Sequence, residues 1–119
     1  MFRILLAEDD EDMRGFLLRA LERAGHDVVA CADGALAYDQ LREAPFDLLL
    51  TDIVMPQMDG IELARRAGDL DPDLKVMFIT GFAAVALAPD SNAPKDAKVL
   101  SKPFHLRELV AEVEKMMAA

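Results

Sequence analysis

The stretch FDLLLTDIVMPQMDG, residues 46–60, decides the fold of this chain. It begins with a mainly apolar run that ends at Thr51, continues with the carboxylate of Asp52, and closes in the turn-forming residues 56–60. A short apolar run bounded by turn residues is typical of a strand buried on both faces, as in a parallel sheet covered by helices. In α/β proteins, ligands bind just beyond the carboxyl ends of such strands. We therefore expect Asp52 to lie in a functional site.

Apolar runs and helical periodicity alternate on both sides of this stretch. We predict strands over residues 3–7, 27–31, 47–51, 75–80 and 98–100. We predict helices over residues 12–24, ending at Gly25, over 61–67 and 105–117, and from a cap at Asp33 to a stop before Pro45. This alternation indicates an α/β fold, with a parallel sheet and helices on both faces. The helical residues expected to face the core are Met13, Phe16, Leu17, Ala20, Leu21, Leu36, Ala37, Leu41, Leu63, Leu106, Leu109, Val110, Val113 and Met117, with Leu70 packing beyond the end of the third helix.

The connector between residues 80 and 98 interrupts the pattern. Pro89, Ser91, Asn92 and Pro94 break what would otherwise be a fourth helix beginning near Phe82, so we expect that helix to be short or irregular. Small apolar residues occupy positions 82–88. They form either a packed connector or a surface that changes conformation.

Composition limits the class of protein. The 119 residues fit one domain, and we expect a single domain over residues 1–119 with no output domain. The net charge of -9, from 13 basic and 22 acidic residues, argues against binding to nucleic acids or anionic membranes. No apolar stretch is long enough for a membrane span, and the single Cys31 excludes an internal disulfide, so we expect a cytoplasmic protein. We expect Cys31 to be packed and both His26 and His105 to lie at the surface.

Charged residues follow three of the predicted strands. Glu8, Asp9 and Asp10 follow the first strand, Asp52 follows the third and Lys102 follows the fifth. Because the carboxyl ends of parallel strands meet at one edge of a sheet, we expect a cluster in which Asp9 and Asp52 bind one Mg²⁺ directly. The metal would relieve the repulsion between the carboxylates. Taken alone, the acidic triplet has another explanation, since acids at the start of a helix are favoured by the helix dipole.

Two further residues lie at strand ends. Thr80 closes the fourth strand beside Gly81, where its hydroxyl group would reach a phosphoryl oxygen, although threonine is also common in strands for its β propensity. Lys102 precedes Pro103, and a cis peptide bond there would direct the lysine ammonium over the strand ends. The alternative for Lys102 is a solvated side chain in a loop.

These motifs resemble the receiver domains of two-component response regulators, and the resemblance covers the whole chain. Residues 4–9 resemble the first strand of that family with its acid pair, and residues 48–60 resemble its phosphoacceptor loop. Residues 79–81 resemble its threonine-bearing strand, and residues 101–104 its Lys-Pro turn. The resemblance implies a flavodoxin-like (CheY-like) doubly wound sheet of five parallel strands in the order 2-1-3-4-5.

The same resemblance implies a role for each residue of the site. Asp52 would accept a phosphoryl group. Lys102 would pair with that group, and Thr80 would move to bond it. Mg²⁺ is the cofactor implied, and no other is expected. The implied metal ligands are Glu8 (through water), Asp9, Asp52 and the backbone carbonyl of Val54.

Three positions depart from the family pattern. Val99 stands where the family usually has an aromatic residue that swings with the threonine to complete the switch. Val54 and Phe82 flank the expected phosphoryl group, and both are apolar. Such side chains disfavour the positioning of an attacking water, so we expect a long-lived phosphoryl group.

Within this family the chain resembles the CpdR-type single-domain regulators. That resemblance implies an adaptor of the ClpXP protease that phosphorylation controls in the bacterial cell cycle. A histidine kinase or histidine phosphotransfer protein would supply the phosphoryl group, and ClpX and protease substrates would be further partners. Two alternatives stay open here: a phosphorelay intermediate that passes the group to a histidine phosphotransfer protein, and a metal-free interaction module.

We do not expect an enzyme, beyond catalysis of the domain's own phosphorylation and dephosphorylation. A phosphohydrolase of the haloacid dehalogenase kind would need a second aspartate where this chain has Val54. The terminal Ala118 and Ala119 are either a degradation tag or a frayed helix end.

Overall fold

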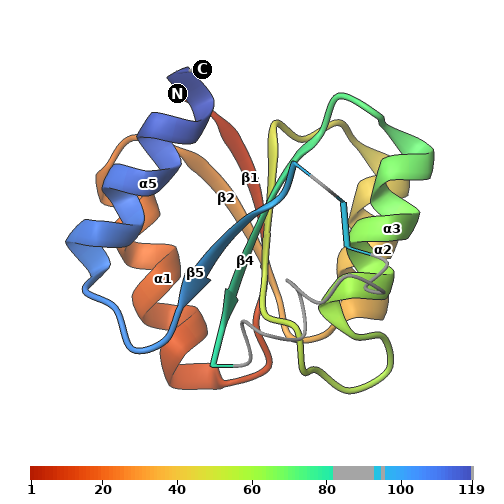
Figure 1. Cartoon of the computed structure of the whole chain (residues 1–119), viewed down its shortest axis with the longest axis horizontal. Helices are drawn as coiled ribbons and strands as arrows, with labels where there is room; N and C mark the ends of the chain where they lie inside the picture. The colour runs from red at the N-terminus through yellow and green to blue at the C-terminus, as the bar shows by residue number, and fades with distance from the viewer. Residues whose placement is uncertain (82–92, 95, 119) are drawn as a thin grey trace.

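Five parallel strands form one sheet at the centre of the molecule (Figure 1). The computed structural model describes residues 1–81, 93–94 and 96–118. The order of the strands across the sheet is β2-β1-β3-β4-β5, which confirms the doubly wound α/β fold predicted from the sequence. The strands are β1 (Arg3–Ala7), β2 (Asp27–Cys31), β3 (Leu48–Thr51), β4 (Lys75–Thr80) and β5 (Lys98–Ser101).

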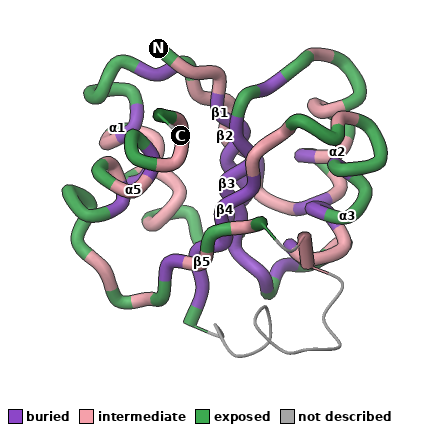
Figure 2. The backbone as a smooth tube through the Cα atoms, turned by 45° about the horizontal axis from the view of Figure 1, so that its top comes forward, coloured by how far each residue is buried: buried purple, intermediate pink, exposed green. Residues whose placement is uncertain are grey.

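Helices cover both faces of the sheet. Figure 1 shows α1 (Glu11–Arg23) and α5 (Leu106–Ala118) on one side, and α2 (Gly34–Glu43) and α3 (Gly60–Leu70) on the other. Successive residues along each strand point to opposite faces of the sheet and pack in different cores. Leu6 and Leu50 belong to the core under α1 and α5, whereas Leu5 and Leu49 belong to the core under α2 and α3. Figure 2 shows the buried residues following the sheet between the two helix pairs, which explains why the strands read as continuous apolar runs.

Three helices begin at aspartates. Each aspartate side chain accepts a hydrogen bond, 2.8 to 3.0 Å long, from the backbone N–H three residues later, which satisfies an otherwise unpaired group in the first turn. The cap predicted at Asp33 is confirmed. As predicted, α1 ends just before Gly25, whose φ of 95° is left-handed. The capping residues are Asp10, Asp33 and Asp59.

The prediction that Phe16, Leu36 and Leu106 face the core is wrong. These residues are 50%, 50% and 39% exposed. Phe16 and Leu36 each lie at the border of the apolar stripe of their helix, where a rotation of about 100° per residue turns one of two adjacent apolar residues away from the sheet. Leu106 is the first residue of α5, one turn before the buried Leu109. In α1 and α2 the inward position belongs to the next residue, Leu17 and Ala37, and both are fully buried.

The prediction that Leu70 packs beyond the third helix is also wrong. The helix α3 continues through Gly68 to Leu70, which is 45% exposed. It ends where the backbone N–H of Asp71 donates to the carbonyl of Ala67. A single glycine in a helix costs about 1 kcal/mol relative to alanine, which is too little to end the helix. The other predicted boundaries agree with the structure to within one residue.

The prediction that His26 lies at the surface is wrong as well. His26 is buried, and its Nδ1 accepts a hydrogen bond from the backbone N–H of Phe2 at 3.2 Å. Its Nε2 lies 2.9 Å from Oε1 of Glu114, so the ring ties the start of β1 to α5. The predictions of a packed Cys31 and an exposed His105 are confirmed.

The short or irregular fourth helix was predicted for residues that lie mostly outside the described part of the chain. Phe82 and Ala119 lie outside it too. Among the helices that the structure describes, none has both the length and the apolar character needed to cross a membrane.

Candidate functional site

Strand pairing brings the acids that follow β1 and β3 together. Ala7 and Thr51 are the last paired residues of these neighbouring strands. The backbone N–H of Asp52 donates to the carbonyl of Ala7 at 3.0 Å, which extends the ladder one residue beyond the strands. Glu8 is fully buried and Asp52 is 8% exposed. Two largely dehydrated carboxylates therefore lie at the same edge of the sheet.

The ammonium group of Lys102 lies between these carboxylates. Its Nζ is 3.0 Å from Oε1 of Glu8 and 2.9 Å from Oδ2 of Asp52. The backbone N–H of Lys102 donates to the carbonyl of Thr80 at 2.8 Å, which holds the lysine at the end of β4. The Lys102–Pro103 peptide bond is cis. Lys102 is thus bound by two acids and is not a solvated loop residue.

Asp9 completes a cluster of three carboxylates. One oxygen atom from each of Glu8, Asp9 and Asp52 lies within 4.8 Å of the others. Asp9 is exposed while the other two are buried, so the cluster opens to solvent on the Asp9 side. Three acids beside the ammonium of Lys102 leave an excess of negative charge. Carboxylate oxygens are the hard donors that Mg²⁺ prefers, and a divalent ion would offset their repulsion, so the residues present fit this metal.

Burial changes the acid–base properties of the cluster. It raises the pKa of Glu8 to about 7; the hydrogen bond from Lys102 opposes this rise and the negative charge of Asp52 adds to it. For Lys102, burial acts to lower the pKa, but the hydrogen bonds to Asp52 and Glu8 outweigh it and raise the pKa above its usual value. Without metal, Glu8 therefore holds a proton over much of the acidic range below pH 7.

We expect Mg²⁺ affinity to fall as the pH is lowered through about 7, because the metal must displace the proton that Glu8 holds below its raised pKa. Release of one proton on binding sets the limit of this loss at about tenfold per pH unit. In the metal-free chain, the stability of the fold has the opposite pH dependence to the Mg²⁺ affinity. The folded state binds the proton more tightly than the unfolded state, so its stability falls as the pH rises from about 4.5 to about 7. Calorimetric titration with MgCl₂ across this pH range measures the first effect.

Glu8→Gln is the control for this pH dependence. The variant cannot release the proton in question, so its weaker Mg²⁺ affinity is expected to vary little between about pH 6 and 8. A pH dependence as steep as that of the wild-type chain would show that another group is responsible.

Two residues that support the cluster were not predicted from the sequence. Nη1 of Arg14 donates to the backbone carbonyl of Glu8 at 2.9 Å and fixes the peptide that carries this acid. The backbone N–H of Gly60 donates to the carbonyl of Ile53 at 2.7 Å and folds the loop after β3 back on itself. Both contacts join groups several residues apart, and apart from the turn glycine itself the sequence carries no signal for them.

The other predicted site residues lie on β4, on β5 and in the loop after β3. Thr80 is fully buried as the last residue of β4, where it pairs with Ser101. Val54 is 57% exposed in the loop after β3. Val99 is partly buried in β5, pairs with Phe78 and packs against the core under α2 and α3. Thr80 and Val99 thus lie on the neighbouring strands β4 and β5, with Thr80 at the end of its strand and Val99 two residues before the end of its own.

The chain matches the family model of the response regulator receiver domain over residues 4–114. It is 73% identical to the response regulator receiver protein CpdR of Brucella abortus, over 100% of this chain and 99% of that protein. It is similar to the structure of a response regulator receiver protein from Sinorhizobium medicae, with a TM-score of 0.90, 34% identity, and coverage of 99% of this chain and 95% of that one. It is also similar to the response regulator TrrA of Thermotoga maritima, solved in complex with Mg²⁺-BeF, with a TM-score of 0.85, 27% identity, and coverage of 98% and 99%.

Proposed function

Because the chain belongs to the response regulator receiver domain family, we propose that it is a response regulator that accepts a phosphoryl group on Asp52. The observation that carries this proposal is the contact of the buried Asp52 with Lys102 at 2.9 Å, beside Glu8 and Asp9. A carboxylate that is shielded from water, paired with a cation and reached from the open Asp9 side is suited to receive a phosphoryl group.

The residues of the site act by position and charge. A carboxylate oxygen of Asp52 forms the new bond to phosphorus, while the bond from phosphorus to the oxygen or nitrogen of the donor breaks. The product carries a charge of about -1.5 to -2, of which Lys102 neutralises part. Glu8, Asp9, Asp52 and the backbone carbonyl of Val54 would hold Mg²⁺, which supplies neutralisation of the phosphoryl oxygens when bound.

Thr80 and Val99 form the proposed switch. Thr80 is buried beside the site, and its carbonyl already accepts the backbone N–H of Lys102. A hydrogen bond from its hydroxyl group to a phosphoryl oxygen would shift the end of β4 and bias the surface formed by β5 and α5, which we call the switch surface. Val99 has no ring to change rotamer, so the shift is carried by the backbone. Each tenfold change in population requires about 1.4 kcal/mol.

The proposed output is a phosphorylation-controlled adaptor of the ClpXP protease, acting as one receiver domain over residues 1–119 in the cytoplasm. The support is the 73% identity to CpdR, which extends over 99% of that protein. The buried, unpaired Cys31 suits a reducing compartment. The proposed partners are a histidine kinase or histidine phosphotransfer protein as donor, and ClpX with its substrates. The chain would catalyse only its own phosphorylation and dephosphorylation.

Intact mass spectrometry tests the phosphoacceptor role. After incubation with acetyl phosphate and Mg²⁺, the wild-type chain is expected to gain the mass of one phosphoryl group, and Asp52→Ala is expected to gain none. An equal gain in both chains would place the group on another residue. No gain in a folded wild-type chain that binds Mg²⁺ would contradict the proposal and favour an interaction module.

Binding measurements on the two forms then test the output. An adaptor is expected to bind purified ClpX in one phosphorylation state far more tightly than in the other. Rapid loss of the phosphoryl group to a purified histidine phosphotransfer protein, without ClpX binding in either state, would indicate a phosphorelay intermediate instead.

We expect a long-lived phosphoryl group, and we expect Val54→Gln to shorten its lifetime about tenfold. Val54 is 57% exposed and apolar, so it offers no group that orients a hydrolytic water, whereas a glutamine amide would do so. The decay of the adduct mass after removal of acetyl phosphate measures the lifetime. Val54→Leu, which stays apolar, should decay like the wild-type chain. Equal decay of the glutamine and leucine variants would contradict this role of Val54.

A further inference from the structure

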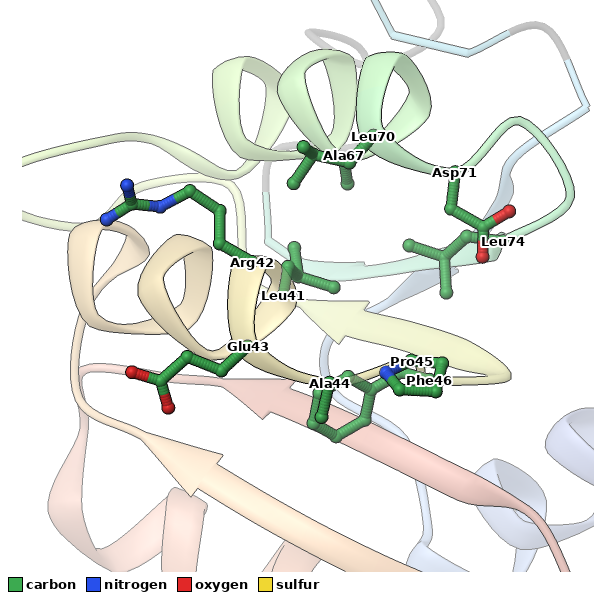
Figure 3. A pocket seen from close by; sticks show the side chains of 10 residues that line it. All are labelled: Leu41, Arg42, Glu43, Ala44, Pro45, Phe46, Ala67, Leu70, Asp71 and Leu74. Carbon is green, nitrogen blue, oxygen red and sulfur yellow. The ribbon is translucent and has the colours of Figure 1, made fainter.

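A cavity of about 360 Å³ lies between the carboxyl-terminal ends of α2 and α3 (Figure 3). Its volume is at the lower end of the range of about 300 to 1,000 Å³ that is usual for ligand pockets. The end of α2, the last turns of α3 and the segments that lead into β3 and β4 contribute its walls. The lining residues are Leu41, Arg42, Glu43, Ala44, Pro45, Phe46, Ala67, Leu70, Asp71 and Leu74.

This cavity lies at the opposite edge of the sheet from Asp52. Its residues 44–46 precede β3 and Leu74 precedes β4, whereas Asp52 follows β3. The four residues of β3 separate the two sites by about 13 Å, at about 3.3 Å per residue. A molecule bound in the cavity therefore leaves the acidic cluster free.

Apolar side chains form the interior of the cavity. Figure 3 shows Leu41 and Leu74 in the space below the end of α3, with Pro45 and Phe46 on the far side. Phe46 is buried, whereas Leu70 is 45% exposed. A large side chain is thus left open to water beside an apolar space, and an aliphatic group placed there would bury both surfaces.

The rim of the cavity is acidic. Glu43 and Asp71 line it, and Asp73 follows two residues after Asp71. Arg42 also lines it, but its guanidinium is paired with Asp39 at 2.5 Å and adds little net charge. The helices α2 and α3 both end here, and each carboxyl-terminal end carries a partial negative charge of about half an elementary charge. One further cation is close by: Nη1 of Arg3 donates to the carbonyl of Pro45 at 3.2 Å, but this guanidinium is paired with Asp27. The unpaired charges around the cavity are therefore negative and attract cations.

We propose that this cavity, the α2–α3 pocket, docks a peptide segment of a partner protein in which aliphatic side chains are flanked by lysine or arginine. An aliphatic side chain fills the space beside Leu70, and the cations lie near Glu43 and Asp71. The proposal is an addition to the function proposed above and does not depend on phosphorylation of Asp52. Since the two sites lie at opposite edges of the sheet, the pocket binds its partner in both phosphorylation states and leaves the switch surface free for a second protein.

Titration of the ¹⁵N-labelled chain with the peptide acetyl-Lys-Leu-Leu-Lys-amide, followed through amide chemical shifts, tests the proposal. We expect saturable shifts at residues 41–46 and 67–74. Replacing both peptide lysines by glutamate is expected to weaken binding about fivefold or more. Leu70→Ser is expected to weaken it about tenfold. Leu36→Ser is the matched control, because Leu36 is exposed to a similar degree on α2 but does not line the pocket.

Shifts confined to other faces, equal binding of the lysine and glutamate peptides, or unchanged binding by Leu70→Ser would each overturn the proposal. A dimer in sedimentation that Leu70→Ser dissociates would overturn it in favour of a second copy of the chain as the occupant. Asp52→Ala separates the two proposals. It is expected to bind the peptide like the wild-type chain although it takes no phosphoryl group, so failure of docking and failure of phosphorylation are distinguishable.

Discussion

Lys102→Met is expected to slow the phosphorylation of Asp52 by acetyl phosphate about 100-fold to 1,000-fold. In the wild-type chain the Lys102 ammonium is 2.9 Å from Oδ2 of Asp52, where negative charge grows as the phosphoryl group arrives. A charge that is already in position costs no reorganisation during the reaction, which is why its removal has a large effect on rate. Methionine keeps the length and the apolar stem of the side chain but not the charge. The initial rate of adduct formation by mass spectrometry measures the change.

The same variant is expected to bind Mg²⁺ about tenfold more tightly before phosphorylation. The ammonium and the metal compete for the same oxygens, since Nζ contacts both Glu8 and Asp52. Without Lys102 the buried acids lack a cation, which destabilises the metal-free chain until Mg²⁺ binds or Glu8 takes up a proton. Calorimetry at about pH 8, above the raised pKa of Glu8, separates metal binding from this protonation.

Lys98→Met is the matched control for Lys102→Met. Lys98 is the first residue of β5, whereas Lys102 directly follows the strand. The side chain of Lys98 is exposed, and its Nζ pairs with Glu112 at 3.2 Å, away from the cluster. Neither the phosphorylation rate nor Mg²⁺ affinity is expected to change in this variant, because exposed ion pairs contribute little. A phosphorylation rate in Lys102→Met within threefold or so of the wild type would contradict the role given to this lysine.

The sheet and the positions of the charged residues were predictable, because they follow from local patterns. Each strand is a short apolar run with a turn signal after it, and a parallel sheet brings the ends of such runs to one edge. The acids after β1 and β3 were therefore expected to meet, as Glu8 and Asp52 do. The cap at Asp33 was predictable for the same reason, since the helix N-terminus depends on neighbouring residues alone.

The remaining features depend on contacts between particular side chains and backbone groups, most of them distant in the sequence. The exposure of Phe16 depends on which side of α1 meets the sheet, and periodicity resolves that direction only to within about one residue. His26 is buried because Phe2 and Glu114 supply partners for its two nitrogens. The hydrogen bond from Arg14 to the Glu8 carbonyl spans six residues, across the turn that starts α1. The helix and strand periodicity of the sequence does not predict any of these three contacts.

Gly60→Ala is expected to lower the free energy of unfolding by about 3 kcal/mol or more, or to prevent folding. A Cβ atom at Gly60 would overlap the backbone carbonyl oxygen of Asp52 and lie 3.0 Å from the Cα of Ile53. Backbone atoms cannot rotate away as a flexible side chain would. The Gly60 N–H also donates to the carbonyl of Ile53 at 2.7 Å, so the start of α3 cannot withdraw without losing this bond. Urea unfolding followed by circular dichroism measures the loss.

Gly68→Ala in the same helix is the control, and its expected effect has the opposite sign. Nothing lies within 4 Å of a Cβ atom at Gly68, so alanine there should raise the free energy of unfolding by about 0.5 to 1 kcal/mol through helix propensity. If Gly60→Ala folds but is less stable, its phosphorylation should also slow, because the peptide that must move to admit the methyl group is the one that carries Asp52. Wild-type stability in Gly60→Ala would mean that the loop after β3 accommodates a methyl group, and the close approach of α3 to Asp52 would then not be required for the site.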